Sequence, residues 1–184
     1  AAYRGHHRRI TIVTDASPWA MGAYLVIGNT IVEYTHDFVT AEDAKALNAE
    51  LGSHRAQQSF ESLIVLVAMR LWKRFWFNKR VRLTVKSDSV AALSVLFKLQ
   101  SRGEGPSLVA RELALDLAQS TYTPVIVEHL PGTANTMSDL LSRLGTVSQK
   151  GPLPDVLRGA SLRICPARGV EFWRSLDPLR SLGK

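Results

Sequence analysis

The order of β-branched and helical segments is the feature of this sequence that most limits its fold. Three short segments of strand-like pattern come first, and two more then alternate with stretches whose apolar residues recur at helical spacing. Strands joined by tight turns are antiparallel, whereas strands joined through a helix are usually parallel. The order βββαβαβα therefore predicts an α/β fold with a mixed five-stranded sheet, its first three strands antiparallel, and helices on both faces.

The expected strands cover residues 10–14, 23–27, 30–35, 81–86 and 124–128, with a turn at Gly28-Asn29. The polar stretch 37–58 is expected to be a loop that holds a short helix. A long buried helix is expected next, with Ser59 as its N-cap and with Trp72 and Trp76 in the core. Further helices are expected at residues 89–100, 108–120 and 138–144, with a helix breaker at residues 101–106.

Composition and length narrow the class of protein. With 184 residues, 46% of them hydrophobic and 21% charged, the chain is long and apolar enough for one domain with a real core. The longest apolar run, residues 63–69, is too short to span a bilayer, and no signal peptide is evident. We therefore expect an intracellular protein that is not secreted and has no membrane partner. The single cysteine, Cys165, excludes an intramolecular disulfide and a thiolate metal cage.

Charge and composition divide the chain into three expected parts. Residues 1–9 form a basic arm, residues 10–148 the folded domain, and residues 149–184 a tail containing proline and arginine. The tail is expected to dock through Val170, Phe172 and Trp173. The net charge of +7 favours a polyanionic partner. A chain that begins with Ala1 rather than Met is expected to be a segment of a longer protein.

Four carboxylates border the apolar elements. Asp15 and Asp88 end strands, whereas Glu61 and Asp139 lie in the first turns of expected helices. Strand ends and helix starts can converge at one edge of such a sheet, and a buried carboxylate is costly unless it is paired or binds a metal. The pattern therefore suggests a pair of Mg²⁺ ions about 4 Å apart, an arrangement that serves phosphoryl displacement.

Each carboxylate also has a simpler interpretation. Asp15 and Asp88 could cap the turns that follow their strands, and Glu61 and Asp139 could interact with helix dipoles. Glu50 is an alternative to Glu61 in the same polar region.

Five motifs occur in an order that resembles a known family. They are TDAS, followed by MGA, then ESLIVLVAMRLW, VKSDS and HLPGTANTMSDLLSR. Together they resemble the type 1 ribonucleases H over about residues 10–145, and most of all the RNase H domains of reverse transcriptases from LTR-retrotransposon-like elements. In the last motif, His129 precedes Asp139 by ten residues and Asn135 precedes it by four, as in active members.

The resemblance implies roles for individual residues. Asp15, Glu61, Asp88 and Asp139 would ligate two Mg²⁺ ions, with Mn²⁺ able to substitute, and His129 would assist proton transfer or product release. The substrate would be the RNA strand of an RNA·DNA hybrid, and an upstream reverse transcriptase domain would be a partner in the same polyprotein. Residues expected to contact nucleic acid are Ser17, Ser89, Asn135, Arg70, Lys73 and Arg74, although the serines are equally suited to capping strands.

Two other functions are alternatives to this one. An inactive RNase H-like clamp or spacer would have lost one or more of the acids, and all four are present. A nuclease of related fold that acts on DNA would lack the HLPGTAN-type ending. The Asp15–Glu61 separation is longer than in compact bacterial members, so the extra region, residues 37–58, is expected to lie over or beside the site.

Overall fold

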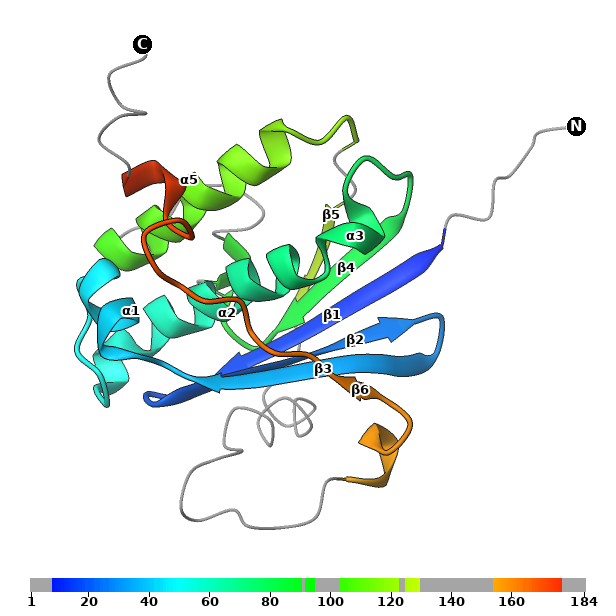
Figure 1. Cartoon of the computed structure of the whole chain (residues 1–184), viewed down its shortest axis with the longest axis horizontal. Helices are drawn as coiled ribbons and strands as arrows, with labels where there is room; N and C mark the ends of the chain where they lie inside the picture. The colour runs from blue at the N-terminus through cyan, green and yellow to red at the C-terminus, as the bar shows by residue number, and fades with distance from the viewer. Residues whose placement is uncertain (1–7, 91, 95–102, 123–124, 130–153, 177–184) are drawn as a thin grey trace, which may run out of the picture.

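The computed structural model describes residues 8–90, 92–94, 103–122, 125–129 and 154–176, the range 125–129 at the level of its backbone. Within these ranges the chain forms a six-stranded sheet of order β5-β4-β1-β2-β3-β6 (Figure 1). The strands are β1 (Arg9–Ala16), β2 (Ala20–Ile27), β3 (Thr30–Phe38), β4 (Arg82–Ser87), β5 (Val125–His129) and β6 (Ser161–Leu162). The first three strands are antiparallel, and β4 and β5 are parallel to β1. The predicted five-stranded mixed sheet is confirmed, and the tail adds a short sixth strand.

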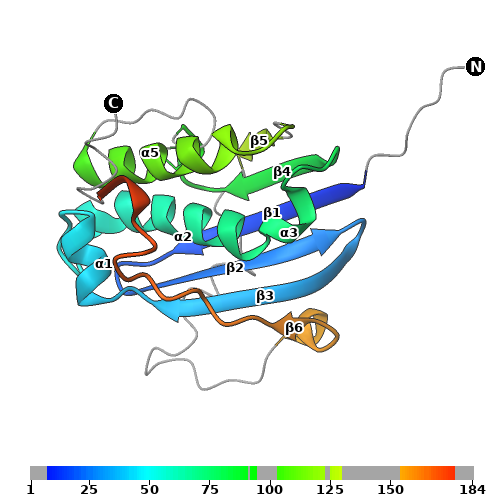
Figure 2. The ribbon, with the colours of Figure 1, turned by 45° about the horizontal axis from the view of Figure 1, so that its top comes forward.

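Helices pack against this sheet. Those whose bounds the described residues define are α1 (Ala41–Ala46), α2 (Gln57–Leu71), α3 (Lys73–Trp76) and α5 (Glu104–Ala118), with short 3₁₀ turns η1 (His54–Ala56), η3 (Asp155–Leu157) and η4 (Arg174–Leu176). The long helices α2 and α5 lie side by side over one face of the sheet (Figure 2). The predicted helix at residues 138–144 lies outside the described residues. None of the helices in the described ranges is long and apolar enough to cross a membrane.

The core lies between β1 and α2. Ile10 and Ile12 of β1 are fully buried, as is every α2 residue from Leu63 to Met69. A helix that is apolar on all sides is typical of the centre of a domain. Trp72 and Trp76 are also buried, as predicted. This packing fixes the position of α2 relative to the central strands, on which the site described below depends.

Two helices begin earlier than the sequence suggests. Helix α2 begins at Gln57, so Ser59 lies within it and is not its N-cap. The Ser59 hydroxyl instead faces α5, because a Cβ built on Gly105 would come within 2.5 Å of it. Helix α5 begins at Glu104 and carries Pro106 in its first turn, where proline is tolerated because that N–H has no partner in the helix. The predicted breaker at 101–106 therefore overlaps a helix start.

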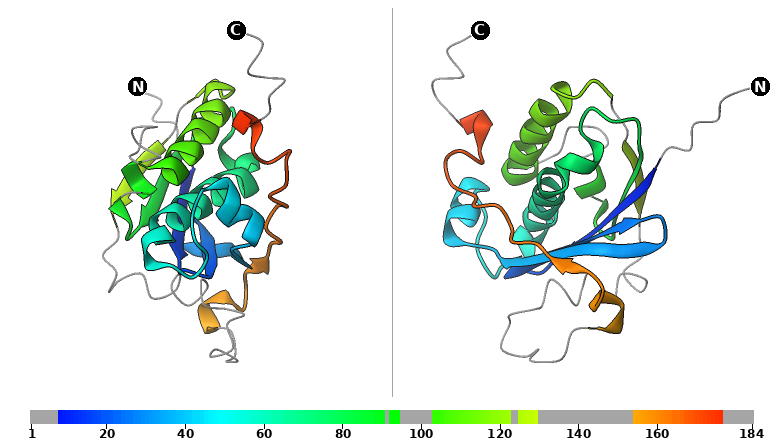
Figure 3. Two further views of the ribbon diagram at one scale, coloured as in Figure 1. Left: turned by 90° about the vertical axis from the view of Figure 1, so that its left-hand side faces the viewer. Right: turned by 45° about the vertical axis from the view of Figure 1, so that its right-hand side comes forward.

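The tail packs against the domain. From β6 it runs past β3 and α2 to reach α5 (Figure 3). Phe172 and Trp173 join the hydrophobic core, as expected, whereas Val170 is 88% exposed and does not dock. Cys165 is buried beside the hydroxyl of Thr35.

Three tail arginines form ion pairs with carboxylates of the domain. Arg163 pairs with Glu33, Arg168 with Asp37 and Asp43, and Arg174 with Asp116. The described part of the tail is thus an integral part of the fold.

Candidate metal centre

The pairing of β1 with β4 brings two aspartates together. The strands are parallel neighbours, and their register ends with Val13 opposite Lys86. Asp15 lies two residues after Val13, near the end of β1, and Asp88 lies two residues after Lys86, just after β4. Each is two residues beyond a paired position, and side chains two residues apart on a strand point to the same face of the sheet. Asp15 and Asp88 therefore occupy equivalent positions on adjacent strands, and such strands lie roughly 4.8 Å apart.

Helix α2 contributes the third carboxylate. Glu61 is the fifth residue of α2 and therefore lies in its second turn, not in its first as predicted. The start of the helix is attached to the end of β1, because Gln57 donates a hydrogen bond from Nε2 to the backbone carbonyl of Ala16 at 3.1 Å. Gln57 and Glu61 are four residues apart and share a helix face. This face places Glu61 beside Asp15.

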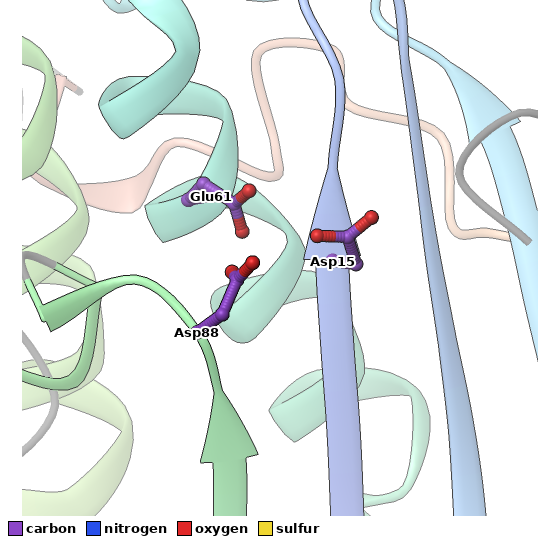
Figure 4. Close-up of side chains that lie close together, drawn as sticks. All are labelled: Asp15, Glu61 and Asp88. Carbon is purple, nitrogen blue, oxygen red and sulfur yellow. The ribbon is translucent and has the colours of Figure 1, made fainter. Parts of the chain in front are cut away.

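The three carboxylates form a compact cluster (Figure 4). One oxygen from each of Asp15, Glu61 and Asp88 lies within 4.8 Å of the other two. At an effective dielectric constant of 20, two unit charges at that distance repel by about 3.5 kcal/mol. The burial of Asp15 and Glu61, which are only 5% and 3% exposed, adds a desolvation cost. A cation bound between the three carboxylates would offset both costs.

Glu61 experiences this environment most strongly. Burial raises its pKa well above the usual value, and the negative charges of Asp15 and Asp88 raise it further. Hydrogen bonds from the Ala16 backbone and Gln57 oppose the shift without reversing it. The Oε2 atom of Glu61 is buried and has no hydrogen-bond partner among the described residues. A cation would supply the missing partner, so the donor set fits a divalent metal.

The chemistry of the donors indicates which metals suit the cluster. Carboxylate oxygens are the ligands that Mg²⁺ and Mn²⁺ prefer, and Mg²⁺ usually keeps several waters or substrate oxygens beside one or two protein carboxylates. Asp88 is partly exposed, so the cluster opens to solvent on its side. Such a site can accept a phosphate oxygen as a further ligand.

His129 stands at the same end of the sheet. It is the last residue of β5 and pairs with Ser87, the residue before Asp88. Its backbone is therefore one strand away from Asp88, and its side chain is not described. Asp139 and Asn135 lie outside the described residues, so their predicted roles stay predictions.

The two predicted serine contacts are occupied by local hydrogen bonds. The Ser17 hydroxyl accepts hydrogen bonds from the backbone N–H groups of Trp19 and Ala20, and so closes the β1–β2 turn. The Ser89 hydroxyl accepts one from Ala92 and caps the helical residues that follow. Both serines therefore have the capping role that the sequence left open.

Arg70 is engaged inside the protein. Its guanidinium donates hydrogen bonds to Asp116 at 2.8 Å and to Glu112 at 2.7 Å, and it lies over the ring of Phe172. The side chain is 16% exposed. Nine residues of helix, about 13 Å, separate it from Glu61. This arrangement argues against the predicted phosphate contact of Arg70 and gives it a structural role.

Lys73 and Arg74 lie beyond the end of α2. The Lys73 ammonium sits over the ring of Phe77, and Arg74 pairs with Glu33. Arg74 is more exposed than Arg70, and the structure brings neither Lys73 nor Arg74 to the carboxylate cluster. Their predicted contact with phosphate stays a prediction.

Glu50 is exposed and does not join the cluster, so the structure favours Glu61 over this alternative. The residue that sequence reasoning missed is Gln57. Its position four residues before Glu61 was the available signal, since such residues face the same way on a helix.

Comparisons with known proteins add little to this geometry. No protein-family model matches the chain, and no curated protein matches it. Among solved structures, LC11-RNase H1, isolated from compost by a metagenomic approach, aligns with 73% of this chain and 91% of its own, at 12% sequence identity and a TM-score of 0.47. The likeness is too slight to identify the chain, so its function must be inferred from the site.

Proposed function

We propose that this protein is a ribonuclease H, a metal-dependent endonuclease that hydrolyses the RNA strand of RNA·DNA hybrids. We propose further that it acts within a cell as the RNase H segment of a retroelement reverse transcriptase polyprotein. The second part depends only on the motif resemblance of residues 10–145.

One observation carries the proposal. Asp15, Glu61 and Asp88 come from three separate sequence motifs, and one oxygen of each lies within 4.8 Å of the other two. Turn-capping aspartates and a helix-dipole glutamate would have no reason to converge, because each would act on its own backbone. The unpartnered Oε2 of Glu61 supports a ligand role over a structural one.

The protein's own residues would have distinct tasks. The carboxylates of Asp15, Glu61 and Asp88 would hold the two divalent ions, with Asp139 as a fourth ligand by resemblance. When bound, the ions would supply Lewis-acid chemistry that lowers the pKa of the attacking water and stabilises the leaving 3′ oxygen. Gln57 orients the start of α2 and thereby Glu61. His129, at the end of β5, would assist proton transfer or product release.

Selectivity for RNA requires contacts to the 2′-hydroxyl and to the A-like groove shape, since these distinguish RNA from DNA. We therefore expect minor-groove contacts and little dependence on base sequence.

Hybrid cleavage is the experiment that tests the proposal. A hybrid labelled on its RNA strand is incubated with Mg²⁺, Mn²⁺ or EDTA, beside RNA and DNA duplexes of the same sequence. The wild type is compared with Asp88→Asn and with the control Asp155→Asn, which changes an exposed aspartate of the tail. We expect metal-dependent cutting of the hybrid's RNA by the wild type and the control, and a loss of at least ~100-fold in Asp88→Asn.

The other outcomes separate the alternatives. Binding of the hybrid without cleavage under any metal would favour an inactive clamp. Cleavage of DNA duplex in preference to the hybrid would favour a related nuclease that acts on DNA. Equal cleavage by wild type and Asp88→Asn would exclude the metal centre described above.

A further inference from the structure

The β1–β2 turn, at the same end of the sheet as the carboxylate cluster, carries a half-exposed tryptophan. The chain has four tryptophans. Trp72, Trp76 and Trp173 are at most 4% exposed, whereas Trp19 is 53% exposed. Exposing an indole to water forgoes much of the free energy that its burial would provide, so the position of Trp19 calls for an explanation.

Hydrogen bonds hold the turn rigidly. The Ser17 N–H donates to the Ala20 carbonyl at 2.8 Å, and the Ser17 hydroxyl accepts from the backbone of Ala20 at 3.1 Å. The Trp19 carbonyl accepts a hydrogen bond from Val39 at 2.9 Å. The backbone that bears the indole is therefore fixed from both sides.

The side chain is fixed as well, because the indole lies against Gly52. A Cβ at Gly52 would come within 2.4 Å of the six-membered ring, so the two groups are in closer contact than any other residue would allow. Gly52 has a φ of +82°, which favours glycine, and its N–H donates to the Pro18 carbonyl at 3.0 Å. One side of the indole thus rests on the protein, and the rest is presented to solvent.

The turn lies at the same end of the sheet as the metal centre. Asp15 pairs with Gly22 and Ala16 with Met21, so the turn begins one pair beyond Asp15. At roughly 3.3 Å per residue, the tip of the turn lies about 10 Å from Asp15. A substrate strand with one phosphate held at the cluster would therefore have neighbouring nucleotides within reach of this tip.

The neighbouring segment adds positive charge. Gly52 leads directly into η1, where Arg55 is exposed beside an exposed His54. A fixed aromatic surface next to a cation is the combination that proteins use to hold nucleic-acid strands, because bases and sugars stack on the ring while the cation attracts phosphate. In Figure 1 the turn and the chain leading from α1 to α2 lie at one end of the molecule.

We propose that Trp19 is a substrate-binding residue, whose indole stacks on a base or sugar of the RNA·DNA hybrid bound at the metal centre. The inference rests on the proposed function and extends it to a residue that contacts the substrate away from the reacting phosphate. Gly52 is its positioning residue, because only glycine leaves room for the indole.

Trp19 provides its own probe, since the other three tryptophans are buried. The full chain is titrated with an RNA·DNA hybrid in EDTA, which prevents cleavage, while tryptophan fluorescence and the anisotropy of a labelled hybrid are recorded. Trp19→Ala, Trp19→Phe and the control Ile164→Ala are compared, the last removing a side chain that is 89% exposed in the tail. Thermal melting checks that each variant is folded, and Trp19→Phe keeps a ring against Gly52.

Stacking predicts that the hybrid quenches the fluorescence of the wild type and that Trp19→Phe abolishes this change. It predicts an increase in Kd of about tenfold for Trp19→Ala, a smaller one for Trp19→Phe, and none for Ile164→Ala. An unchanged Kd in folded Trp19→Ala, or quenching that persists in Trp19→Phe, would overturn the inference. The proposed function fails separately, if the wild type binds the hybrid but does not cleave it with Mg²⁺.

Discussion

At Glu61, burial and like charge act in the same direction. The side chain is 3% exposed, and both effects raise its pKa because each disfavours the ionised form. Asp15 and Asp88 lie close enough to repel it, and its Oε2 finds no hydrogen bond within the described part of the chain. Like charges buried together lower the stability of the fold, and functional sites often carry such a cost because the same groups bind a ligand.

Because burial and the neighbouring negative charges both disfavour ionised Glu61, we predict that Glu61→Gln stabilises the protein when no metal is present. Removing the buried charge should raise the free energy of unfolding at neutral pH by about 1 kcal/mol in EDTA. Mg²⁺ should stabilise the wild type by RT ln(1 + [Mg²⁺]/Kd), which rises with the logarithm of its concentration above Kd, and should stabilise the variant much less. Denaturant melts with and without Mg²⁺ measure both effects, with Glu171→Gln, an exposed glutamate of the tail, as the control. A variant that is less stable than the wild type in EDTA would refute the strained-site interpretation.

At the scale of elements, the strands follow the sequence closely and the helix starts do not. Predicted strand 30–35 is β3 (Thr30–Phe38), and predicted strand 81–86 is β4 (Arg82–Ser87), because runs of β-branched residues are a local signal. Helix α2 begins at Gln57, whose side chain donates a hydrogen bond to the carbonyl of Ala16, 41 residues away, and the residues near Ser59 do not reveal this contact.

The tail shows the same limit of sequence reasoning. Its aromatic pair Phe172-Trp173 was a visible signal for docking, since apolar residues are conspicuous in a polar segment. Its arginines carry no comparable signal in the sequence. Arg168 pairs with Asp43, 125 residues away, and no local pattern identifies that partner.

The Arg168 pair gives a prediction about the tail. The Arg168 side chain is 4% exposed and Asp43 is fully buried, so Arg168→Gln leaves a buried carboxylate without its counter-charge. We expect a loss of about 3 to 5 kcal/mol in the free energy of unfolding. The matched control is Arg158→Gln in the same tail, whose pair with Asp155 is 73% and 83% exposed and should contribute less than about 0.5 kcal/mol. Similar melting of the two variants would contradict the claim that the buried Arg168 pair stabilises the fold.

Glu33 of β3 gives the attachment of the tail a pH dependence. Burial acts to raise its pKa, but hydrogen bonds from Arg163 and Trp72 and the charge of Arg74 outweigh it, so the pKa is below its usual 4.5. A depressed pKa means that the stabilisation is complete above the unfolded-state value and is lost as the pH falls through the folded-state value. The difference in melting temperature between the wild type and Glu33→Gln should therefore shrink as the pH falls below 4.5. A difference that stays constant from neutral pH to strongly acidic pH would contradict this account.

At the scale of the whole molecule, the acidic side chains fall into two groups: those paired with tail arginines and those clustered with one another. Tail arginines neutralise carboxylates on β3, α1 and α5, so these buried acids are paired within the protein. The carboxylates of Asp15, Glu61 and Asp88 lie in the same domain but form a cluster of like charge. A chain with a net charge of +7 that nevertheless gathers three acids at one point is suited to holding cations against a polyanion.

Direct measurement of Mn²⁺ binding is the test closest to this central claim. Electron paramagnetic resonance of Mn²⁺ is recorded with increasing amounts of wild-type protein and of an Asp15→Asn/Asp88→Asn double variant, both shown to be folded. Loss of the free-ion signal with the wild type, and its recovery when excess Mg²⁺ is added, is the predicted result, with binding weaker by about tenfold or more in the double variant. Equal Mn²⁺ binding by the two proteins would contradict the claim that this carboxylate cluster is a metal centre.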